Sequence, residues 1–158
     1  MKSNLISKSD TAKVLGDINE QWHVEIPKLK NLRIYELDDG ARIITGDGIT
    51  ALKVEEEYLP FLTETKMLEK FPNVTVDMGA VKFMCDGANV MRPGIRSHSS
   101  FEKDQIVCVV EESQRKFLAV GRALVSSTDM EAMTKGPVIK NMHYVSDKYW
   151  EIKKSLKE

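Results

Sequence analysis

The chain of 158 residues is 42% hydrophobic and 30% charged, which is typical of a folded globular protein and excludes a disordered one. Its formal net charge of −1 excludes nucleic-acid binding through overall positive charge, so any such contact must come from a local patch. No run approaches about 18 consecutive apolar residues and the N-terminus lacks the apolar core of a signal peptide, so we expect a cytoplasmic protein without membrane contact. Cys85 and Cys108 have no second cysteine at metal-ligand spacing, and we expect two buried thiols, no metal and no cofactor.

Residues 1–71 alternate between helical and strand patterns and carry no catalytic signature. A first helix is predicted over residues 10–22, with Ser9 or Asp10 as its cap. Its inward face consists of Val14, Leu15, Ile18 and Trp22, which recur at helical spacing. A second helix is predicted to open at Leu59-Pro60 and to end at Phe71-Pro72, with Phe61, Leu62, Thr65 and Leu68 facing inward.

Short strands are predicted between these two helices. Leu32 and Ile34 alternate with a polar residue, and Asp39-Gly40 is a hairpin signal before a strand at 41–45. Residues 49–54 predict another strand, and the acidic run that follows them is typical of a solvated surface. The N-terminal part is therefore expected to be an α+β unit.

The segment 76–96 combines a short helix with a glycine turn. Asp77 is expected to cap the helix, and Ala80, Val81, Phe83 and Met84 are expected to share its inward face. Gly87 stands where a helix ends in a left-handed residue. Pro93-Gly94 suits the central positions of a type II turn, and residues 96–100 predict a polar loop.

Later strands complete the predicted C-terminal part. Residues 105–110 and 117–125 predict apolar strands, and Gly121 within the second indicates a bulge or a close backbone approach. Residues 128–131 match a capping box, and residues 138–145 predict a last strand. Several short strands with glycine corners in so short a stretch favour a small, nearly closed barrel.

An ordered series of motifs over residues 74–152 resembles the PUA domain, a small RNA-binding β-barrel. The series is Asp77-x-Gly79-Ala80, Gly87-Ala88-Asn89-Val90-Met91-x-Pro93-Gly94-Ile95, Phe101-x-x-Asp104-x-x-Val107, Ala119-Val120-Gly121-x-Ala123, Ser126-Ser127 and Lys135-Gly136-x-x-Ile139-x-x-x-His143-Tyr144-x-x-Asp147-x-x-Trp150. The PUA family usually has Gly-Asp where this chain has Lys103-Asp104, which leaves the backbone conformation of that loop open. The resemblance implies an α+β pre-PUA domain over residues 1–72, followed by a PUA pseudo-β-barrel over residues 73–158.

Motifs before and at the start of the PUA-like stretch indicate a particular family of PUA-domain proteins. Leu59-Pro60-Phe61-Leu62, Met67-Leu68-Glu69-Lys70-Phe71-Pro72 and Gly79-Ala80-Val81-Lys82-Phe83 are similar to the pre-PUA-to-PUA junction of the malignant T-cell-amplified sequence family, with its yeast translation-machinery-associated and archaeal relatives. This resemblance implies a non-catalytic RNA-binding factor of the translation machinery that contacts rRNA or tRNA at the small ribosomal subunit. In eukaryotes the family pairs with the density-regulated protein, which leaves a partner of that kind as an open alternative.

Backbone amides without bulky side chains, near residues 79–87 and 93–94, can hold phosphates or a terminal nucleotide with help from a few cations. The candidate RNA-binding residues are Gly79, Ala80, Lys82, Gly87, Ala88, Asn89, Met91, Arg92, Pro93, Gly94, Arg96, Arg115 and Lys116. Lys82 and Arg92 are the favoured phosphate contacts, whereas the glycines are expected to serve backbone geometry first. His143 and Trp150 are expected to pack the barrel or its closing turn.

Two other classes of function stay open on the sequence. A protein-interaction adaptor would dock its partner on residues 1–71, and an accessory RNA-recognition subunit would serve RNA modification or ribosome biogenesis. An enzyme is disfavoured because Cys85 and Asp86 lie beside a helix end without a base, and no other catalytic constellation appears at informative spacing.

Overall fold

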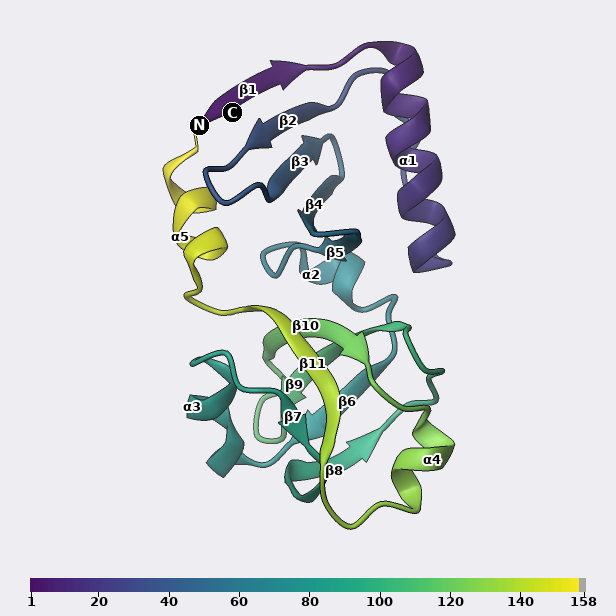
Figure 1. The fold of residues 1–158 in the computed structure, drawn as a ribbon, viewed down its shortest axis with the longest axis vertical. Coiled ribbons are helices and arrows are strands. Elements are labelled where there is room, and N and C mark those ends of the chain that lie inside the picture. Colours follow the sequence, from purple (N-terminus) through teal and green to yellow (C-terminus); the bar gives the residue numbers. More distant parts are fainter. Residues whose placement is uncertain (157–158) are drawn as a thin grey trace.

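The N-terminal strands form one antiparallel sheet, in the upper half of Figure 1. The computed structural model describes residues 1–156 and orders these strands β1-β2-β3-β4-β5. They are β1 (Lys2–Leu5), β2 (Arg33–Glu36), β3 (Arg42–Gly46), β4 (Ile49–Val54) and β5 (Glu57–Pro60). The predicted hairpin joins β2 to β3, with Gly40 at a φ of +90°. β1 is absent from the sequence prediction because its four residues are all exposed and show no apolar alternation.

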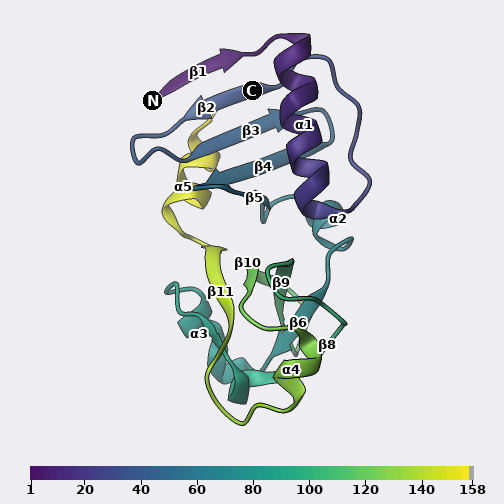
Figure 2. The same ribbon diagram turned by 45° about the vertical axis from the view of Figure 1, so that its right-hand side comes forward.

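Helix α1 (Lys8–Trp22) packs against this sheet (Figure 2). Ile18 and Trp22 are buried as predicted, and the indole Nε1 of Trp22 donates to the carbonyl of Tyr58 at 2.7 Å, which fastens α1 to β5. The predicted cap is wrong. Ser7 caps the helix instead, and its hydroxyl accepts the amide of Asp10 at 3.0 Å.

The predicted second helix is wrong over its first half. Residues 57–60 form β5, whose register is fixed by pairing with β4 and by the side chain of Gln21, which accepts the Tyr58 amide at 2.8 Å. A single helical turn, α2 (Thr65–Leu68), follows. Leu68 is buried as expected, whereas Thr65 is exposed, and Met67 is buried beside Leu68 instead.

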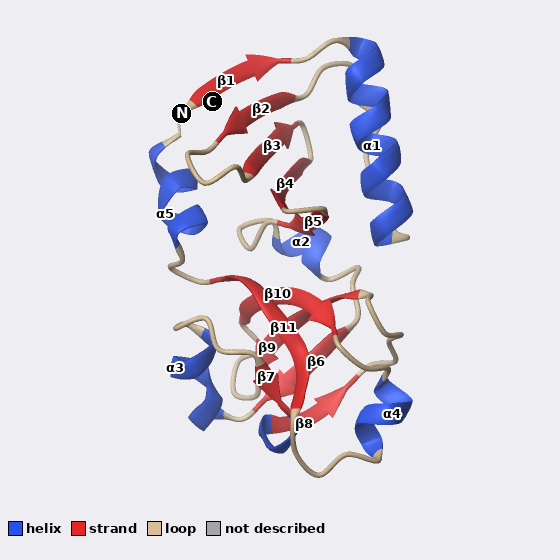
Figure 3. Cartoon of the chain, in the orientation of Figure 1, coloured by secondary structure: helices blue, strands red, loops and turns tan. Residues whose placement is uncertain are grey.

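The C-terminal strands form a nearly closed barrel sheet of mixed direction, in the lower half of Figure 1. They are β6 (Asn73–Val76), β7 (Val90–Met91), β8 (Ile95–His98), β9 (Ile106–Glu111), β10 (Phe117–Ala123) and β11 (Pro137–Tyr144). Their order is β7-β11-β10-β9-β6-β8, and β6 runs parallel to β9 while every other pair is antiparallel. Helices α3 (Val81–Met84) and α4 (Ser127–Glu131) flank it on opposite sides in Figure 3.

Gly121 confirms the expected close approach of β10 and β11. The register of the two strands shifts between Val120 and Gly121, and a Cβ at Gly121 would stand 1.9 Å from the carbonyl oxygen of Lys140. Two other predictions in this part are wrong. The polar loop at 96–100 is largely β8, because its backbone pairs with β6, and the cap of α4 is Ser126, whose hydroxyl accepts the amide of Asp129.

The loop in which this chain departs from the usual Gly-Asp pair has a left-handed residue. Asp104, and not Lys103, has a positive φ, of 71°. Its amide donates to the carbonyl of Ala123 at 2.8 Å, which ties the loop to the end of β10. The unusual backbone conformation is therefore carried by an aspartate, a residue that tolerates it better than most.

The strand β9 is apolar on both faces because it belongs to two cores. Val107 and Val109 lie inside the barrel, whereas Ile106 and Cys108 pack with the buried residues of the N-terminal sheet. This explains the uninterrupted apolar run in the sequence, since a strand buried on both faces does not alternate. Cys108 is fully buried as predicted, but Cys85 is only half-buried.

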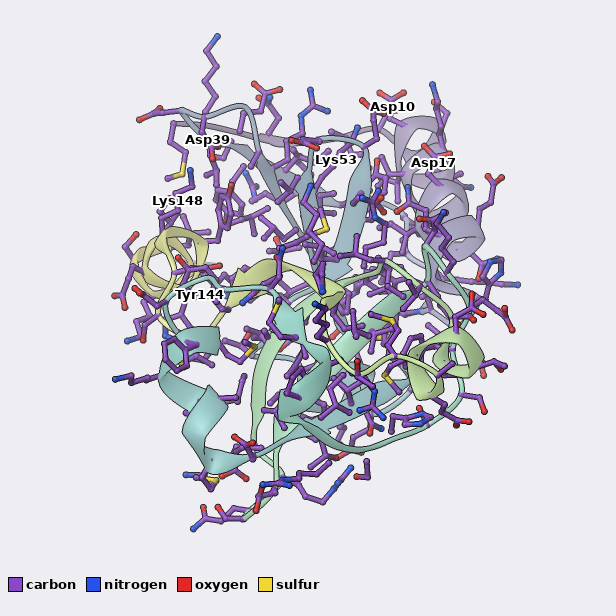
Figure 4. The ribbon with its side chains drawn as sticks, turned by 60° about the horizontal axis from the view of Figure 1, so that its bottom comes forward. Asp10, Asp17, Asp39, Lys53, Tyr144 and Lys148 are labelled. Carbon is purple, nitrogen blue, oxygen red and sulfur yellow. The ribbon has the colours of Figure 1, made fainter. Side chains whose placement is uncertain are left out.

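The last helix, α5 (Lys148–Ser155), returns to the N-terminal sheet (Figures 1 and 2). The hydroxyl of Tyr149 and the Nζ of Lys148 each lie 2.7 Å from Oδ2 of Asp39; Asp39 and Lys148 are labelled in Figure 4. Trp150 is half-buried against a cluster that joins the N-terminal sheet to Ile106, Cys108 and Val120 of the barrel strands. The division of the chain at residues 72 and 73 stays a prediction.

His143 joins the two parts of the chain and does not merely pack the barrel. Its side chain is fully buried, and its Nε2 accepts the amide of Leu62 at 3.2 Å. Its Nδ1 donates to Oδ2 of Asp147 at 2.8 Å, and Asp147 also accepts the amides of Tyr144 and Trp150. Burial opposes the ionisation of Asp147, but these hydrogen bonds outweigh it and hold the pKa of its carboxyl below its usual range.

Candidate nucleic-acid interface

The candidate interface begins where β6 ends, at the cap of a short helical segment. The carboxylate of Asp77 accepts the amide of Ala80 at 3.0 Å, as predicted, and the chain makes a 3₁₀ turn, Met78–Ala80, before α3. The amide of Asp77 donates to the carbonyl of Gly94 at 3.0 Å. The start of the helical segment is thereby fixed against the turn that precedes β8.

The segment ends at Gly87 in the left-handed conformation, which confirms that prediction. Gly87 has a φ of +90°, and its amide donates to the carbonyl of Met84 at 3.2 Å. The amide of Ala88 donates to the carbonyl of Phe83 at 3.0 Å. These bonds satisfy carbonyl groups that the end of a helix leaves without partners.

The predicted type II turn at Pro93-Gly94 is wrong. Residues Arg92–Gly94 form a 3₁₀ turn, and Gly94 does not have the positive φ that a type II turn requires. Gly94 contributes in another way. It lies beside Ala80, whose Cβ would be 3.7 Å from a Cβ at Gly94, an ordinary contact distance.

Between α3 and this turn lies an open cleft of about 330 Å³, which we call the α3 cleft. It is lined by Val76, Asp77, Gly79, Ala80, Phe83, Met84, Ala88, Asn89, Val90, Met91 and Gly94. Apolar groups dominate this lining, which includes two glycines. Its chemistry fits a flat apolar group such as a nucleobase better than a phosphate.

Large apolar side chains are exposed around the α3 cleft. Phe83 is 54% exposed, Met78 49% and Met91 48%, which are high values for such residues. The prediction that Phe83 faces inward is therefore wrong. Because α3 is only four residues long, one side chain can be buried fully under it, and Met84 takes that place at 3% exposure.

Lys82 is exposed beside Phe83, as its position on the polar side of α3 predicts. Its Nζ lies 5.3 Å from the centroid of the Phe83 ring, within reach of a cation–π contact. It forms no ion pair within the described residues 1–156. A cation and an aromatic ring are thus presented together at the mouth of the α3 cleft.

Arg92 and Arg96 are less free than the sequence implies. The Nε of Arg92 donates to the carbonyl of Met130 at 2.9 Å, which holds its guanidinium at α4. Arg96 has a nitrogen 3.7 Å from each of two carboxylates, Asp77 and Glu112. Only some of the N–H donors of these two guanidinium groups are therefore available to a ligand.

Arg115 and Lys116 lie in the turn between β9 and β10, at the end of β6 that leads into Asp77. Arg115 has a positive φ of 55° and donates to the hydroxyl of Thr75 at 3.0 Å, while Lys116 is exposed. The structure therefore gathers Arg96 and Arg115 near the cap of the helical segment, and it separates Arg92 from them.

The sequence prediction and the α3 cleft share Gly79, Ala80, Ala88, Asn89, Met91 and Gly94. Gly87 and Pro93 adjoin the cleft in sequence but do not line it. Sequence reasoning missed Phe83 as a surface group, and the signal that could have found it is the short distance from the Asp77 cap to the Gly87 stop. So short a helix cannot bury four apolar side chains.

Comparison with known proteins identifies the family. A model of the PUA domain matches residues 72–145. An uncharacterised protein of Methanocaldococcus jannaschii is 35% identical over 96% of this chain and 97% of its own. Human malignant T-cell-amplified sequence 2 is 34% identical over 85% of this chain and 78% of its own length. Translation machinery-associated protein 20 of Saccharomyces cerevisiae is 30% identical over 79% of this chain and 74% of its own length.

The chain belongs to the malignant T-cell-amplified sequence and translation machinery-associated protein 20 family, and its C-terminal part is a PUA domain. A crystal structure of a hypothetical protein from Pyrococcus horikoshii has a TM-score of 0.80 at 25% identity, over 96% of this chain and 99% of that one. The predicted fold class is thereby confirmed. Within residues 1–156, no group of three His, Cys, Asp or Glu side chains could hold a metal ion, and no described helix is long and apolar enough to cross a membrane.

Proposed function

We propose that this family member is a non-catalytic RNA-binding protein of the translation machinery and that it holds an unpaired nucleotide of rRNA or tRNA in the α3 cleft. One observation carries the proposal: an exposed aromatic ring, Phe83, lies beside Lys82 at an apolar cleft, and Lys82 has no ion pair within residues 1–156. Single-stranded RNA is recognised by this pairing of base stacking with local positive charge.

The charges of the described residues indicate which side chains contact the phosphates and which contact the bases. Arg92 and Arg96 spend part of their donor capacity within the protein, so phosphate contacts rest mainly on Lys82, with Arg115 and Lys116 at the neighbouring turn. Few phosphate contacts give a weak salt dependence. Stacking of one base on an aromatic ring contributes about 1–3 kcal/mol, so the ring is as important as the cations.

The setting in translation rests on relatives. The yeast relative is named for its association with the translation machinery, and the family is shared over most of both chains. We infer that the present chain acts at the small ribosomal subunit in the cytoplasm. A density-regulated-protein-like partner would then dock on the N-terminal sheet and α1, leaving the α3 cleft free for RNA.

An RNA titration over a series of salt concentrations tests the proposal. The probe is a fluorescent RNA hairpin with a short unpaired 3′ tail, compared with the same hairpin without the tail. Lys82→Glu combined with Lys116→Glu should weaken binding of the tailed RNA and reduce the slope of log K against log salt by about 0.7 for each lost phosphate contact. Phe83→Ala should weaken binding about tenfold without changing that slope.

The matched control is Lys28→Glu combined with Lys66→Glu, which makes the same change of charge on exposed residues of the N-terminal part. Unchanged RNA binding is expected for this pair. If the double variant at 82 and 116 keeps full affinity with a native circular dichroism spectrum, the site is wrong. If the wild type binds neither RNA, while a protein partner is captured through residues 1–71, the adaptor function is correct instead.

A further inference from the structure

One wall of the α3 cleft is an irregular segment, residues 84–89, that is held by a side chain from another strand. The Nδ2 of Asn141, on β11, donates to the carbonyl of Met84 at 3.1 Å and to the carbonyl of Ala88 at 3.0 Å. The main-chain amide of Asn141 donates to Oδ1 of Asn89 at 3.0 Å. One residue therefore makes three hydrogen bonds to both ends of this wall.

No regular pairing could hold the segment in this way. The strand β7 is two residues long and pairs with β11 only at Pro137 and Ile139, so the ladder stops before Ala88 and Asn89. On the other side, α3 ends at Met84. Asn141 bridges the gap between the helix end and the short strand.

The chemistry of the site requires an amide. Both hydrogens of Nδ2 point to carbonyl oxygens, whereas Oδ1 of Asn141 is buried and has no hydrogen-bond partner among the described residues. The reversed amide would place Oδ1 against two carbonyl oxygens and is excluded by repulsion. An aspartate at this position would suffer the same repulsion, since an ionised carboxylate can only accept.

We propose that Asn141 is the positioning residue of the α3 cleft: it holds Ala88 and Asn89 at a fixed distance from Phe83, so that an RNA base fits between them. The proposal rests on the proposed function, because the base is the ligand. Asn141 itself does not line the cleft. It acts through the wall, and its loss should lower RNA affinity without removing any RNA contact.

Tyr144 provides the matched control on the same strand. Its ring packs against Gly87, where a Cβ would be 3.1 Å away, and Figure 4 labels it. Tyr144→Phe keeps this packing and removes only a hydroxyl. Its RNA affinity should equal that of the wild type, so that a loss of affinity in Asn141→Leu cannot be assigned to substitution of a β11 residue as such.

The first measurement does not depend on RNA. In Asn141→Leu and Asn141→Asp, hydrogen exchange at the amides of Gly87 and Ala88 should accelerate about tenfold or more, because the wall opens locally. Exchange at Val107 and Val109 in the barrel core should stay unchanged. Equal acceleration at all four amides would mean global destabilisation and would overturn the positioning role, as would unchanged exchange at Gly87 and Ala88.

The second measurement is RNA affinity with the tailed hairpin. Asn141→Leu should raise Kd about tenfold with an unchanged salt slope, because no charge is altered. In the wild type, saturating RNA should slow exchange of the Asn141 side-chain amide protons, a readout that needs no variant. Wild-type affinity of Asn141→Leu, or unchanged side-chain exchange with RNA, would overturn the proposal. Absence of RNA binding by the wild type would instead refute the proposed function, with the wall still tested by the first measurement.

Discussion

Replacing His143 by leucine tests how the two parts of the chain are joined. The imidazole is fully buried and connects the amide of Leu62 in the N-terminal part to Asp147 at the cap of α5. Leucine fills a similar space but can neither accept nor donate a hydrogen bond. The variant therefore removes the polar connection and keeps most of the packing.

The expected cost follows from the groups left behind. The buried amide of Leu62 would lose its acceptor, which costs about 1–3 kcal/mol. Asp147 would lose its hydrogen bond to the ring, which contributes about 1.5–3 kcal/mol when one partner is ionised, but it keeps the amides of Tyr144 and Trp150. Since the apolar leucine offsets part of this loss, we expect His143→Leu to lower the free energy of unfolding by about 3 kcal/mol.

Urea unfolding followed by circular dichroism and by tryptophan fluorescence measures this change. The two signals should separate in the variant if the parts of the chain then unfold in succession, and the m-value should fall. His98→Leu is the control: that ring is half-buried, but its partners Ser99 and Glu131 both lie in the C-terminal part, so its loss should leave the two signals coincident. A cost under about 1 kcal/mol for His143→Leu, with an unchanged m-value, would refute the reasoning.

Two further substitutions test the strand contact and the last helix. Gly121→Ala would place a Cβ 1.9 Å from the carbonyl oxygen of Lys140, so thermal unfolding should show a loss of at least about 2 kcal/mol, and a wild-type melting temperature would contradict the close approach. The hydrogen bonds from Lys148 and Tyr149 lower the pKa of Asp39 to about 2. The contribution of Asp39 to the free energy of unfolding is therefore present above pH 3.8 and disappears as the pH falls toward 2. Asp39→Asn should lower the free energy of unfolding by at most about 1 kcal/mol at pH 7, because solvent screens the group. Between pH 4 and 2 the urea midpoint of this variant should fall less than that of the wild type. Parallel pH profiles of the two proteins would contradict the pairing of Asp39 with Lys148 and Tyr149.

Local signals in the sequence predicted the elements that depend on neighbouring residues. The cap at Asp77, the left-handed stop at Gly87 and the β2–β3 hairpin agree with the structure. Each is decided within a few residues by backbone conformation and hydrogen bonding to adjacent amides. The ordered PUA motifs added the barrel, which periodicity alone could suggest but not specify.

Predictions failed where a partner distant in sequence decides the conformation. Leu59-Pro60 carries the pattern of a helix start, but pairing with β4 and the contact of Trp22 with Tyr58 make that stretch a strand. Residues 96–98 look like a polar loop and become β8 through pairing with β6. In both places a tertiary contact outweighs a local preference of a fraction of a kcal/mol.

The sequence by itself determined the family, the strand-rich C-terminal part and most of the residues around the α3 cleft, because these follow from local backbone chemistry and motif order. Only the tertiary structure decided that Phe83 is exposed, that Arg96 is paired with carboxylates, and that His143 and Asn141 join segments far apart in the chain. Hydrogen bonds and burial between distant segments depend on how the chain closes on itself, and no spacing in the sequence encodes that distance.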